Sequence, residues 1–222
     1  MAAAYRAAYQ APEGPRVGYL LAPCDREDPA PLHEGPDVCY LSAPYRGLGH
    51  LLACWGDIRK EVPEATLRCA YGWQVFESMA ASAPNLRKMR PVLESMFEQP
   101  GVTWMDRLPQ RKVREVLDSC RVWAYPCDYD EYFCSTALRA QARQCYPVVV
   151  PRAALAETVL GGRRVETDLT TASGRQPFVS AVVEALQEDT RSERYAVREH
   201  ALREHDACVA AWRTVLEQDG LL

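Results

Sequence analysis

The sequence predicts an α/β protein in which a parallel sheet carries helices on both faces. From residue 37 onward, short apolar runs alternate with segments whose apolar residues recur every three or four positions. The first pattern is typical of buried strands and the second of amphipathic helices. Their alternation favours a parallel sheet, because consecutive parallel strands need a long crossover, usually a right-handed helical one.

Composition sets the limits of this prediction. The chain has 222 residues, 48% hydrophobic and 25% charged, which is the usage of a folded protein. This length fits one domain with extensions or two very small domains, since a domain takes about 100–200 residues. The net charge of −4 argues against a nucleic-acid surface, which needs a basic face. No apolar run approaches the ~20 residues that cross a bilayer, so we expect no transmembrane segment.

The N-terminal region is expected to stand apart from the domain. Residues 1–15 form an Ala-rich arm, residues 16–21 are a candidate first strand, and a Pro-rich linker follows to residue 36. This arm lacks the apolar core of a secretory signal, so we expect a cytoplasmic protein. The domain itself is assigned to residues 37–222.

Strands and helices alternate through the first half of the domain. Their predicted ranges are, in order, 38–41, 48–60, 66–71, 82–98, 102–104 and 110–119. The strands are short apolar runs, and the helices carry apolar residues at helical spacing, as at Leu48, Leu51 and Leu52. Pro63 ends the first helix, and Pro91 is the point at which the second could break.

The second half continues the alternation and closes with two helices. Its predicted ranges are 121–125, 133–143, 146–150, 153–159, 178–187 and 193–217. Residues 146–150 are a strand followed at once by Pro151, and the helix after it ends at Gly161 and Gly162. The last helix alternates acids and bases between Arg191 and His205, which is typical of an exposed helical face.

The nine cysteines predict neither a disulfide framework nor a metal site. An odd number cannot all pair, and in a reducing compartment free cysteines behave as small buried hydrophobes. The sequence contains no Cys-x-x-Cys pair, and His200 and His205 are five apart, off one helical face. We therefore expect no metal site.

Ligands of parallel sheets bind beyond the carboxyl ends of the strands. The strongest candidate for a ligand site in this sequence follows such a strand end. A strand ends at Tyr125, an acidic loop follows, and a helix begins with Cys134, Ser135 and Thr136 in its first turn. A helix start offers unpaired N–H groups that suit a phosphate, and the two hydroxyls add donors. Glu131 can accept hydrogen bonds from sugar hydroxyls. The alternative role for Glu131 is that of an acid that caps an ordinary helix start.

A second candidate segment begins at Ser42 and reads Ser-Ala-Pro-Tyr-Arg-Gly-Leu-Gly-His. Arg46 can pair with a phosphate bidentately, and Gly47 permits close backbone approach. The alternative is a tight turn with a solvated arginine. Two further residues follow strand ends, Trp73 and Arg107, and of the five tryptophans Trp73 is the one expected beside a ligand. The others are expected in the core.

In this order, these segments resemble the donor-binding, C-terminal half of retaining GT-B glycosyltransferases that use nucleotide sugars (glycosyl transferases group 1, family 4-like). The resemblance runs from about Asp37 to Leu216. It rests on the segment that begins at Ser42, on the one that contains Glu131, and on six others, which begin at Pro63, Gly101, Val122, Ala140, Ala153 and Arg198. It implies a Rossmann-like sheet that forms one half of a GT-B fold.

The resemblance also implies roles for residues. Two glutamates eight positions apart bracket the family's donor helix, the first contacting the transferred sugar and the second the ribose. Glu131 matches the first, whereas Arg139 stands at the second position and can only donate hydrogen bonds. Arg46 matches one of two basic residues against the diphosphate, and Asp106 stands where the family often has glycine. The implied donor is a nucleotide-diphospho-sugar, with no cofactor and no metal.

The resemblance covers only half of a GT-B enzyme, because the stretch before residue 37 is too short to form an acceptor-binding half. The chain is then a glycosyltransferase donor subunit that needs an acceptor-domain partner chain or a second copy of itself, or part of a longer enzyme. The alternative is a catalytically degenerate binding or scaffold subunit that works with a partner. A third reading, an unrelated Rossmann-like domain for another nucleotide, lacks a dinucleotide fingerprint.

Overall fold

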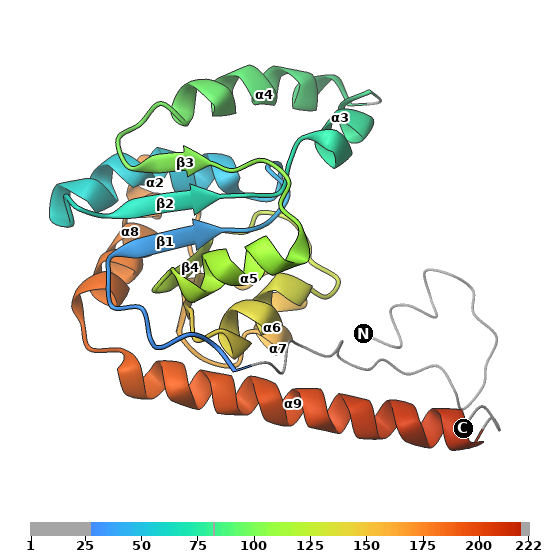
Figure 1. Ribbon diagram of the computed structural model, residues 1–222. Helices are drawn as coiled ribbons and strands as arrows, with labels where there is room; N and C mark the ends of the chain where they lie inside the picture. Colours follow the sequence, from blue (N-terminus) through green and yellow to red (C-terminus); the bar gives the residue numbers. More distant parts are fainter. Residues whose placement is uncertain (1–27, 82, 219–222) are drawn as a thin grey trace.

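A six-stranded, all-parallel sheet forms the centre of the protein (Figure 1). The structure is a computed structural model that describes residues 28–81 and 83–218. The strand order is β3-β2-β1-β4-β5-β6. The strands are β1 (Asp37–Tyr40), β2 (Thr66–Cys69), β3 (Val102–Trp104), β4 (Val122–Tyr125), β5 (Tyr146–Val149) and β6 (Arg163–Arg164). The predicted fold class, a Rossmann-like parallel sheet with helices on both faces, is confirmed.

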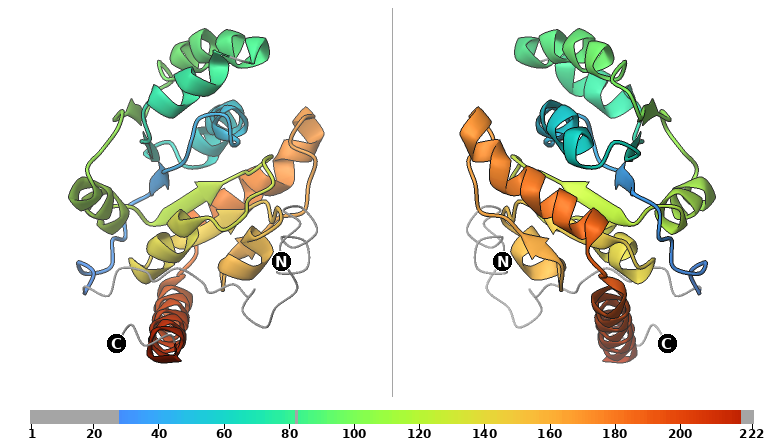
Figure 2. Two further views of the ribbon diagram at one scale, coloured as in Figure 1. Left: turned by 90° about the vertical axis from the view of Figure 1, so that its right-hand side faces the viewer. Right: turned by 90° about the vertical axis from the view of Figure 1, so that its left-hand side faces the viewer.

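Helices cover both faces of the sheet. On one face α2 (Leu48–Glu61) packs against α8 (Ala172–Gln187), and α5 (Gln110–Asp118) and α6 (Ser135–Ala142) lie on the other (Figures 1 and 2). The long α9 (Arg191–Gln218) packs on α6 and extends beyond the sheet. The remaining helices lie at the edges: α3 (Gln74–Ala80), α4 (Pro84–Met96) and α7 (Leu155–Thr158).

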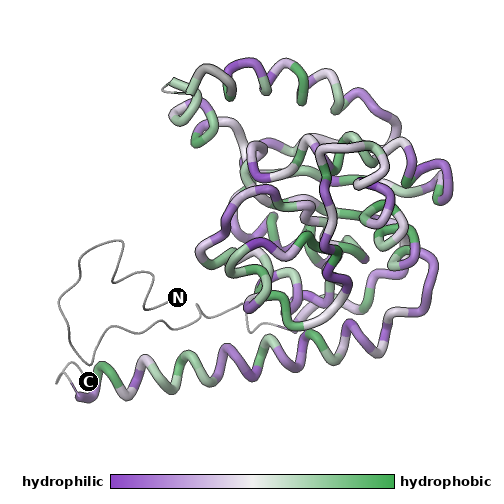
Figure 3. Tube along the Cα trace, turned by 180° about the vertical axis from the view of Figure 1, so that it is seen from behind, coloured by the Kyte–Doolittle hydropathy of each residue, from purple (hydrophilic) through white to green (hydrophobic). Residues whose placement is uncertain are grey.

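The core lies on both faces of the sheet, around β4 and β5. Every residue of β4 and β5 is buried, as a strand covered on both faces requires. Trp55 on α2 and Trp123 on β4 are fully buried in this core. In Figure 3 hydrophobic residues gather in the interior, whereas hydrophilic and hydrophobic residues alternate along α9.

The structure differs from the sequence prediction at several elements. Helix α3 and strand β6 were not predicted, and residues 16–21 lie outside the described part of the chain. Helix α8 begins six residues earlier than expected, because the Thr171 hydroxyl accepts from Gly174 N (3.0 Å) and caps the helix ahead of Pro177. Helix α4 continues through Pro91, whose exposed position lets water satisfy the carbonyl that loses its partner.

Candidate functional site

The chain reverses its direction of winding between β1 and β4. From β1 it moves outward through β2 to β3, and from β4 it moves outward the opposite way through β5 to β6. The loops that follow β1 and β4 therefore diverge and leave a crevice at the carboxyl ends of these neighbouring strands, which is where such sheets bind ligands. These loops carry the two segments that the sequence singled out.

An ion pair between Arg46 and Glu131 joins the two loops. Arg46 Nη1 donates to both carboxylate oxygens of Glu131, at 3.1 Å each. The Glu131 side chain is 4% exposed, whereas the Arg46 side chain is 27% exposed and remains accessible. The guanidinium also lies over the ring of Tyr129, 4.6 Å from its centroid, a favourable cation–π arrangement.

The Tyr125 side chain also holds the carboxylate of Glu131, and Ser42 contacts Tyr125 in turn. The Tyr125 hydroxyl donates to Glu131 Oε1 and lies 3.1 Å from the Ser42 hydroxyl. Burial raises the pKa of Tyr125, and the neighbouring acidic groups, Glu131 among them, raise it further. Tyr125 therefore stays protonated and keeps donating at any physiological pH. Arg46 stays charged as well: burial opposes its charge, but the Glu131 carboxylate raises the arginine pKa.

These groups line a cavity of about 310 Å³, which we name the Arg46 pocket. It is lined by Ser42, Arg46, Tyr71, Tyr129, Glu131, Tyr132, Phe133, Cys134, Ser135 and Thr136. Helix α6 begins in this pocket, and within the described chain its first turn has neither an acid nor a capping side chain. The helix start therefore leaves a partial positive charge and amide donors at the cavity wall.

A second cavity of about 300 Å³ adjoins the first, because Tyr71, Ser135 and Thr136 line both. We name it the Arg107–Arg139 pocket. Its remaining lining residues are Leu41, Ala70, Gln74, Val75, Arg107, Leu108, Gln110, Val113 and Arg139. Most of these are apolar, while the two arginines supply charge. The two pockets together form one groove along the carboxyl ends of β1, β2 and β4.

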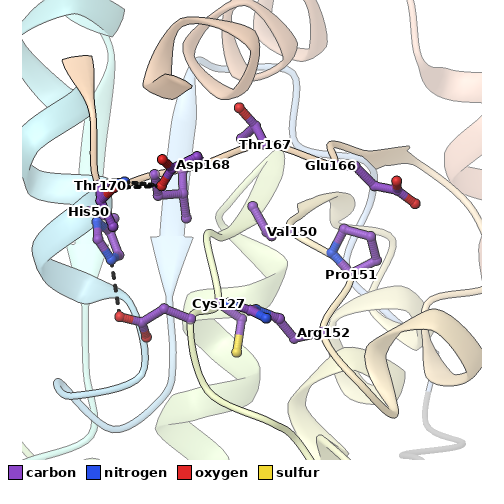
Figure 4. A pocket seen from close by; sticks show the side chains of 11 residues that line it. His50, Cys127, Val150, Pro151, Arg152, Glu166, Thr167, Asp168 and Thr170 are labelled. Atoms are coloured by element: carbon purple, nitrogen blue, oxygen red, sulfur yellow. Dashed lines mark hydrogen bonds and ion pairs between the residues drawn. The ribbon is translucent and has the colours of Figure 1, made fainter. Parts of the chain in front are cut away.

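A third cavity, of about 390 Å³, lies on the far side of the β1–α2 turn (Figure 4). His50 Nε2 lies 3.0 Å from Asp128 Oδ2 at one wall. Three lining residues are acidic, Asp128, Glu166 and Asp168, against one guanidinium, Arg152. Hydrogen bonds from Thr170 lower the pKa of Asp168, which is therefore ionised. This cavity repels a diphosphate despite its larger volume, so we place the candidate site in the other two.

Most of the residues singled out in the sequence meet at the groove. Arg46, Glu131, Cys134, Ser135 and Thr136 line the Arg46 pocket, and Arg107 and Arg139 line its neighbour. Burial, followed by the charge of Glu131, raises the pKa of the Cys134 thiol to about 12, so this thiol is neutral near pH 7. Among the described residues, no group of three or more potential metal ligands gathers anywhere.

Gly47 and Trp73 face other parts of the protein. Gly47 adopts φ of 109°, and a Cβ atom there would lie 2.0 Å from the carbonyl oxygen of Pro126. The backbone at Gly47 therefore approaches the loop after β4 closely, and the close approach expected toward a ligand is made within the protein instead. Trp73 lines neither pocket of the groove and packs edge-on against Phe76, with ring centroids 5.1 Å apart. An indole ring gains more from that apolar cluster than from a polar groove.

Sequence reasoning missed three tyrosines of the site. Tyr125 holds the carboxylate, Tyr129 lies against the guanidinium, and Tyr71 lines both pockets. Tyr71 and Tyr125 lie at or just beyond the ends of β2 and β4, and Tyr129 lies in the loop after β4. A tyrosine at the end of a buried strand is a usable signal, because its hydroxyl needs a polar partner there.

Solved structures with this fold are GT-B glycosyltransferases. A mutant of Staphylococcus aureus TarM, in complex with fondaparinux, α-GlcNAc-glycerol and UDP, has a TM-score of 0.65 at 10% identity, over 85% of this chain and 37% of that chain. The GtfA/B complex has a TM-score of 0.64 at 16% identity, over 91% and 39%. A UDP-forming trehalose-phosphate synthase from Burkholderia xenovorans has a TM-score of 0.64 at 15% identity, over 84% and 44%.

This chain therefore has the fold of one half of a GT-B protein, and it spans less than half the length of each of those three. The sequence matches no known protein family and no curated protein. In the part of the chain that the structure describes, no helix combines the length and the apolar character needed to cross a bilayer.

Proposed function

We propose that residues 37–222 bind a nucleotide-diphospho-sugar and supply the donor half of a glycosyl transfer. The observation that carries this proposal is the Arg46–Glu131 pair, held at the start of α6 in the crevice between β1 and β4. A guanidinium and a helix N-terminus suit a diphosphate. A fixed carboxylate, which only accepts hydrogen bonds, suits the hydroxyls of a sugar.

In the proposed reaction the bond between the sugar and the diphosphate breaks, and negative charge grows on the departing nucleotide. Arg46, the α6 amides and the hydroxyl of Ser135 would stabilise that charge from fixed positions, which lowers the barrier because these groups need not reorganise during the step. Glu131 would hold the sugar. Transfer with retention of configuration is what the sequence resemblance implies, and we keep it as part of the proposal.

Two of the solved structures support uridine nucleotides as the first donors to test. The TarM mutant is in complex with UDP, and the Burkholderia xenovorans synthase is UDP-forming. The match covers less than half of each of those chains, so the proposed acceptor-binding half would lie outside these residues, in a longer chain, a partner chain or a second copy. The GtfA/B structure is a complex, which is consistent with such an arrangement.

One observation favours a second candidate function, a non-catalytic binding or scaffold subunit. Arg46 and Glu131 form an ion pair, so the charges of these two groups already balance in the Arg46 pocket. A donor would have to compete with Glu131 for the guanidinium. A scaffold subunit would keep the same pair for stability alone and would bind no nucleotide.

Calorimetric titration with UDP and UDP-sugars separates the two functions. We expect binding by the wild-type chain, and stabilisation of about 2.7 kcal/mol at a ligand concentration 100 times Kd. Ser135→Asp puts a carboxylate into the exposed first turn of α6, where it favours the helix but repels a diphosphate. We expect Kd to rise at least about tenfold in this variant.

Ser173→Asp is the matched control, since it makes the same change in the exposed first turn of α8. It should leave Kd unchanged. If no nucleotide diphosphate or nucleotide sugar binds the folded wild-type chain, or if both variants bind as wild type does, the donor proposal is wrong and the scaffold function is favoured.

A further inference from the structure

The Arg107–Arg139 pocket adjoins the Arg46 pocket and is positively charged. Both charged residues that line it are arginines, and its described lining contains no carboxylate. A guanidinium donates hydrogen bonds and accepts none. The hydroxyls of a plain ribose are best held by an acceptor such as a carboxylate, so this lining is poorly suited to an unmodified ribose.

A single hydrogen bond orients the Arg139 side chain at the wall of this pocket. Its Nη1 donates to Gln110 Oε1 at 2.6 Å, which ties the side chain of α6 to the first residue of α5. That is the only hydrogen bond of Arg139 to the described residues, so most of its five N–H donors stay available to the pocket.

Arg107 reaches the pocket from the other wall. It follows Asp106, whose φ of 53° turns the chain sharply after β3, and the Asp106 carbonyl accepts from Tyr71 N at 3.1 Å. The Arg107 side chain is exposed and makes no ion pair or hydrogen bond within the described ranges 28–81 and 83–218. Asp106 is the nearest acid along the chain, and it does not line the pocket.

Two helix starts add to the positive potential. Both α5 and α6 begin at this pocket, through Gln110 and Ser135, and neither has an acid in its first turn. Further along α5, Arg111 and Lys112 are paired with Glu115 and lie outside the lining. Two guanidiniums and two helix N-termini thus face one cavity whose wall, as far as residues 28–81 and 83–218 form it, holds no carboxylate.

We propose that the Arg107–Arg139 pocket binds a phosphate monoester on the ribose of the bound nucleotide, in addition to the diphosphate in the Arg46 pocket. This inference rests on the proposed function. The two cavities share Tyr71, Ser135 and Thr136, so one ligand spans both. A phosphate monoester carries up to two negative charges and three acceptor oxygens, which match the guanidinium donors of Arg107 and Arg139. The ligand class is a nucleotide that is phosphorylated at the 2′ or 3′ position.

Matched nucleotides test this directly by calorimetric titration. Uridine and adenosine 5′-monophosphates are compared with their 3′,5′-bisphosphates, and for adenosine also with the 2′,5′-bisphosphate, so that only the ribose phosphate differs. We expect a bisphosphate to bind the wild-type chain at least about tenfold more tightly than its monophosphate. Arg139→Gln and Arg107→Gln should each remove most of that gain.

Arg139→Glu gives the sharper test, because it replaces two features of the pocket at once. The carboxylate repels a ribose phosphate and accepts from free ribose hydroxyls, so the preference should reverse in favour of the monophosphate. Arg111→Glu makes the same charge change on α5 outside the lining and should keep the wild-type preference. A wild-type preference that is retained in Arg139→Glu overturns the inference.

The remaining outcomes separate this inference from the proposed function. If UDP binds and Arg46→Ala weakens it, while no bisphosphate is preferred, the inference is wrong and the donor site stands. If bisphosphates bind through Arg139 and Arg46→Ala leaves UDP binding unchanged, the ribose-phosphate site stands and the diphosphate site in the Arg46 pocket is wrong. If inorganic phosphate occupies the pocket with the same dependence on Arg139 but no nucleotide gains from its ribose phosphate, the ligand is free phosphate and the inference fails.

Discussion

At the scale of single residues, the two side chains of the Arg46–Glu131 pair differ in burial and in the hydrogen bonds that hold them. Glu131 is almost fully buried and depends on Arg46 and Tyr125 for its hydrogen bonds, whereas Arg46 is partly exposed. Removing the arginine leaves a buried carboxylate without its counter-charge. Removing the glutamate leaves a guanidinium that water can still reach. The two truncations should therefore differ in cost.

We expect Arg46→Met to lower the free energy of unfolding by about 2–3 kcal/mol, somewhat less than the loss of a fully buried partner. Glu131→Gln should cost less, about 1–2 kcal/mol, because an amide still accepts from Tyr125. The double variant should cost less than the sum of the two, since no unpaired charge remains. Urea denaturation of all four proteins gives the coupling free energy.

The exposed pair Arg111–Glu115 provides the control cycle, with an expected coupling of about 0.5 kcal/mol or less. Additive losses at Arg46 and Glu131 would mean that the pair contributes no more than this surface pair does, contrary to the structure.

The sequence identified Arg46 and Glu131 one at a time, each as a polar residue soon after a strand. It could not pair them, because the two residues are 85 positions apart and meet only through the β1–β4 neighbourhood. Tyr125 was counted as strand, and its hydroxyl acquires its role only once Glu131 lies above it. Side chains that act through a tertiary neighbour leave little local signal.

At the scale of elements, Asp37 ties the first strand to the second. Its Oδ1 accepts from Thr66 Oγ1 at 2.5 Å and from Arg68 Nη2 at 3.1 Å, both on β2, and its Oδ2 contacts His33. Burial opposes the charge of Asp37, but the hydrogen bonds from Thr66 and His33 and the charge of Arg68 outweigh it, so the pKa of Asp37 is lowered.

This lowered pKa predicts an acid-dependent contribution to stability. A carboxylate whose folded-state pKa lies below its unfolded value of about 3.9 stabilises the fold above that pH and loses the contribution as pH falls through the folded-state pKa. We expect Asp37→Asn to be destabilised at pH 7, and its deficit relative to wild type to shrink as pH falls below about 4. Urea denaturation at several pH values measures the deficit.

Asp57→Asn serves as the control, since among the described residues Asp57 pairs only with an exposed lysine on its own helix. Its small deficit should come from a surface ion pair. A deficit of Asp37→Asn that stays constant from pH 7 to pH 3 would show that the carboxylate charge contributes nothing to the β1–β2 contact.

Most strands were predicted closely, whereas strand β6 and helix α3 were missed. Strand β3 has the predicted bounds, and β1, β4 and β5 begin or end within one residue of theirs, because each is an apolar run with polar flanks. Strand β6 has two exposed residues and exists only through its pairing with β5. Helix α3 has seven residues, too few to show a helical period.

At the scale of the whole molecule, Arg194 fastens α9 to the sheet domain. It is 1% exposed, and its guanidinium donates to Gln144 O at 2.7 Å and to His33 O at 2.9 Å. These carbonyls belong to the turn before β5 and to the segment before β1, so one side chain joins three distant parts of the chain. Burial lowers the pKa of Arg194, but an arginine remains charged at neutral pH.

Arg194→Met should therefore lower the free energy of unfolding by about 2–4 kcal/mol, because it leaves two carbonyl groups without their charged donor. Arg203→Met, two to three turns further along α9 at an exposed position, should change stability by about 0.5 kcal/mol or less. Thermal and urea unfolding measure both variants. Equal effects would mean that the Arg194 contacts add nothing to the docking of α9.

The sequence by itself determined the order and type of most elements, the parallel sheet, and the residues that follow its strands, because strand and helix periods are local properties of the chain. Only the tertiary structure decided that β1 and β4 are neighbours, that Arg46 and Glu131 neutralise each other, and that Arg107 and Arg139 share a cavity without a carboxylate. Charge balance in a pocket depends on which distant loops converge there, and short-range patterns carry no information about that convergence.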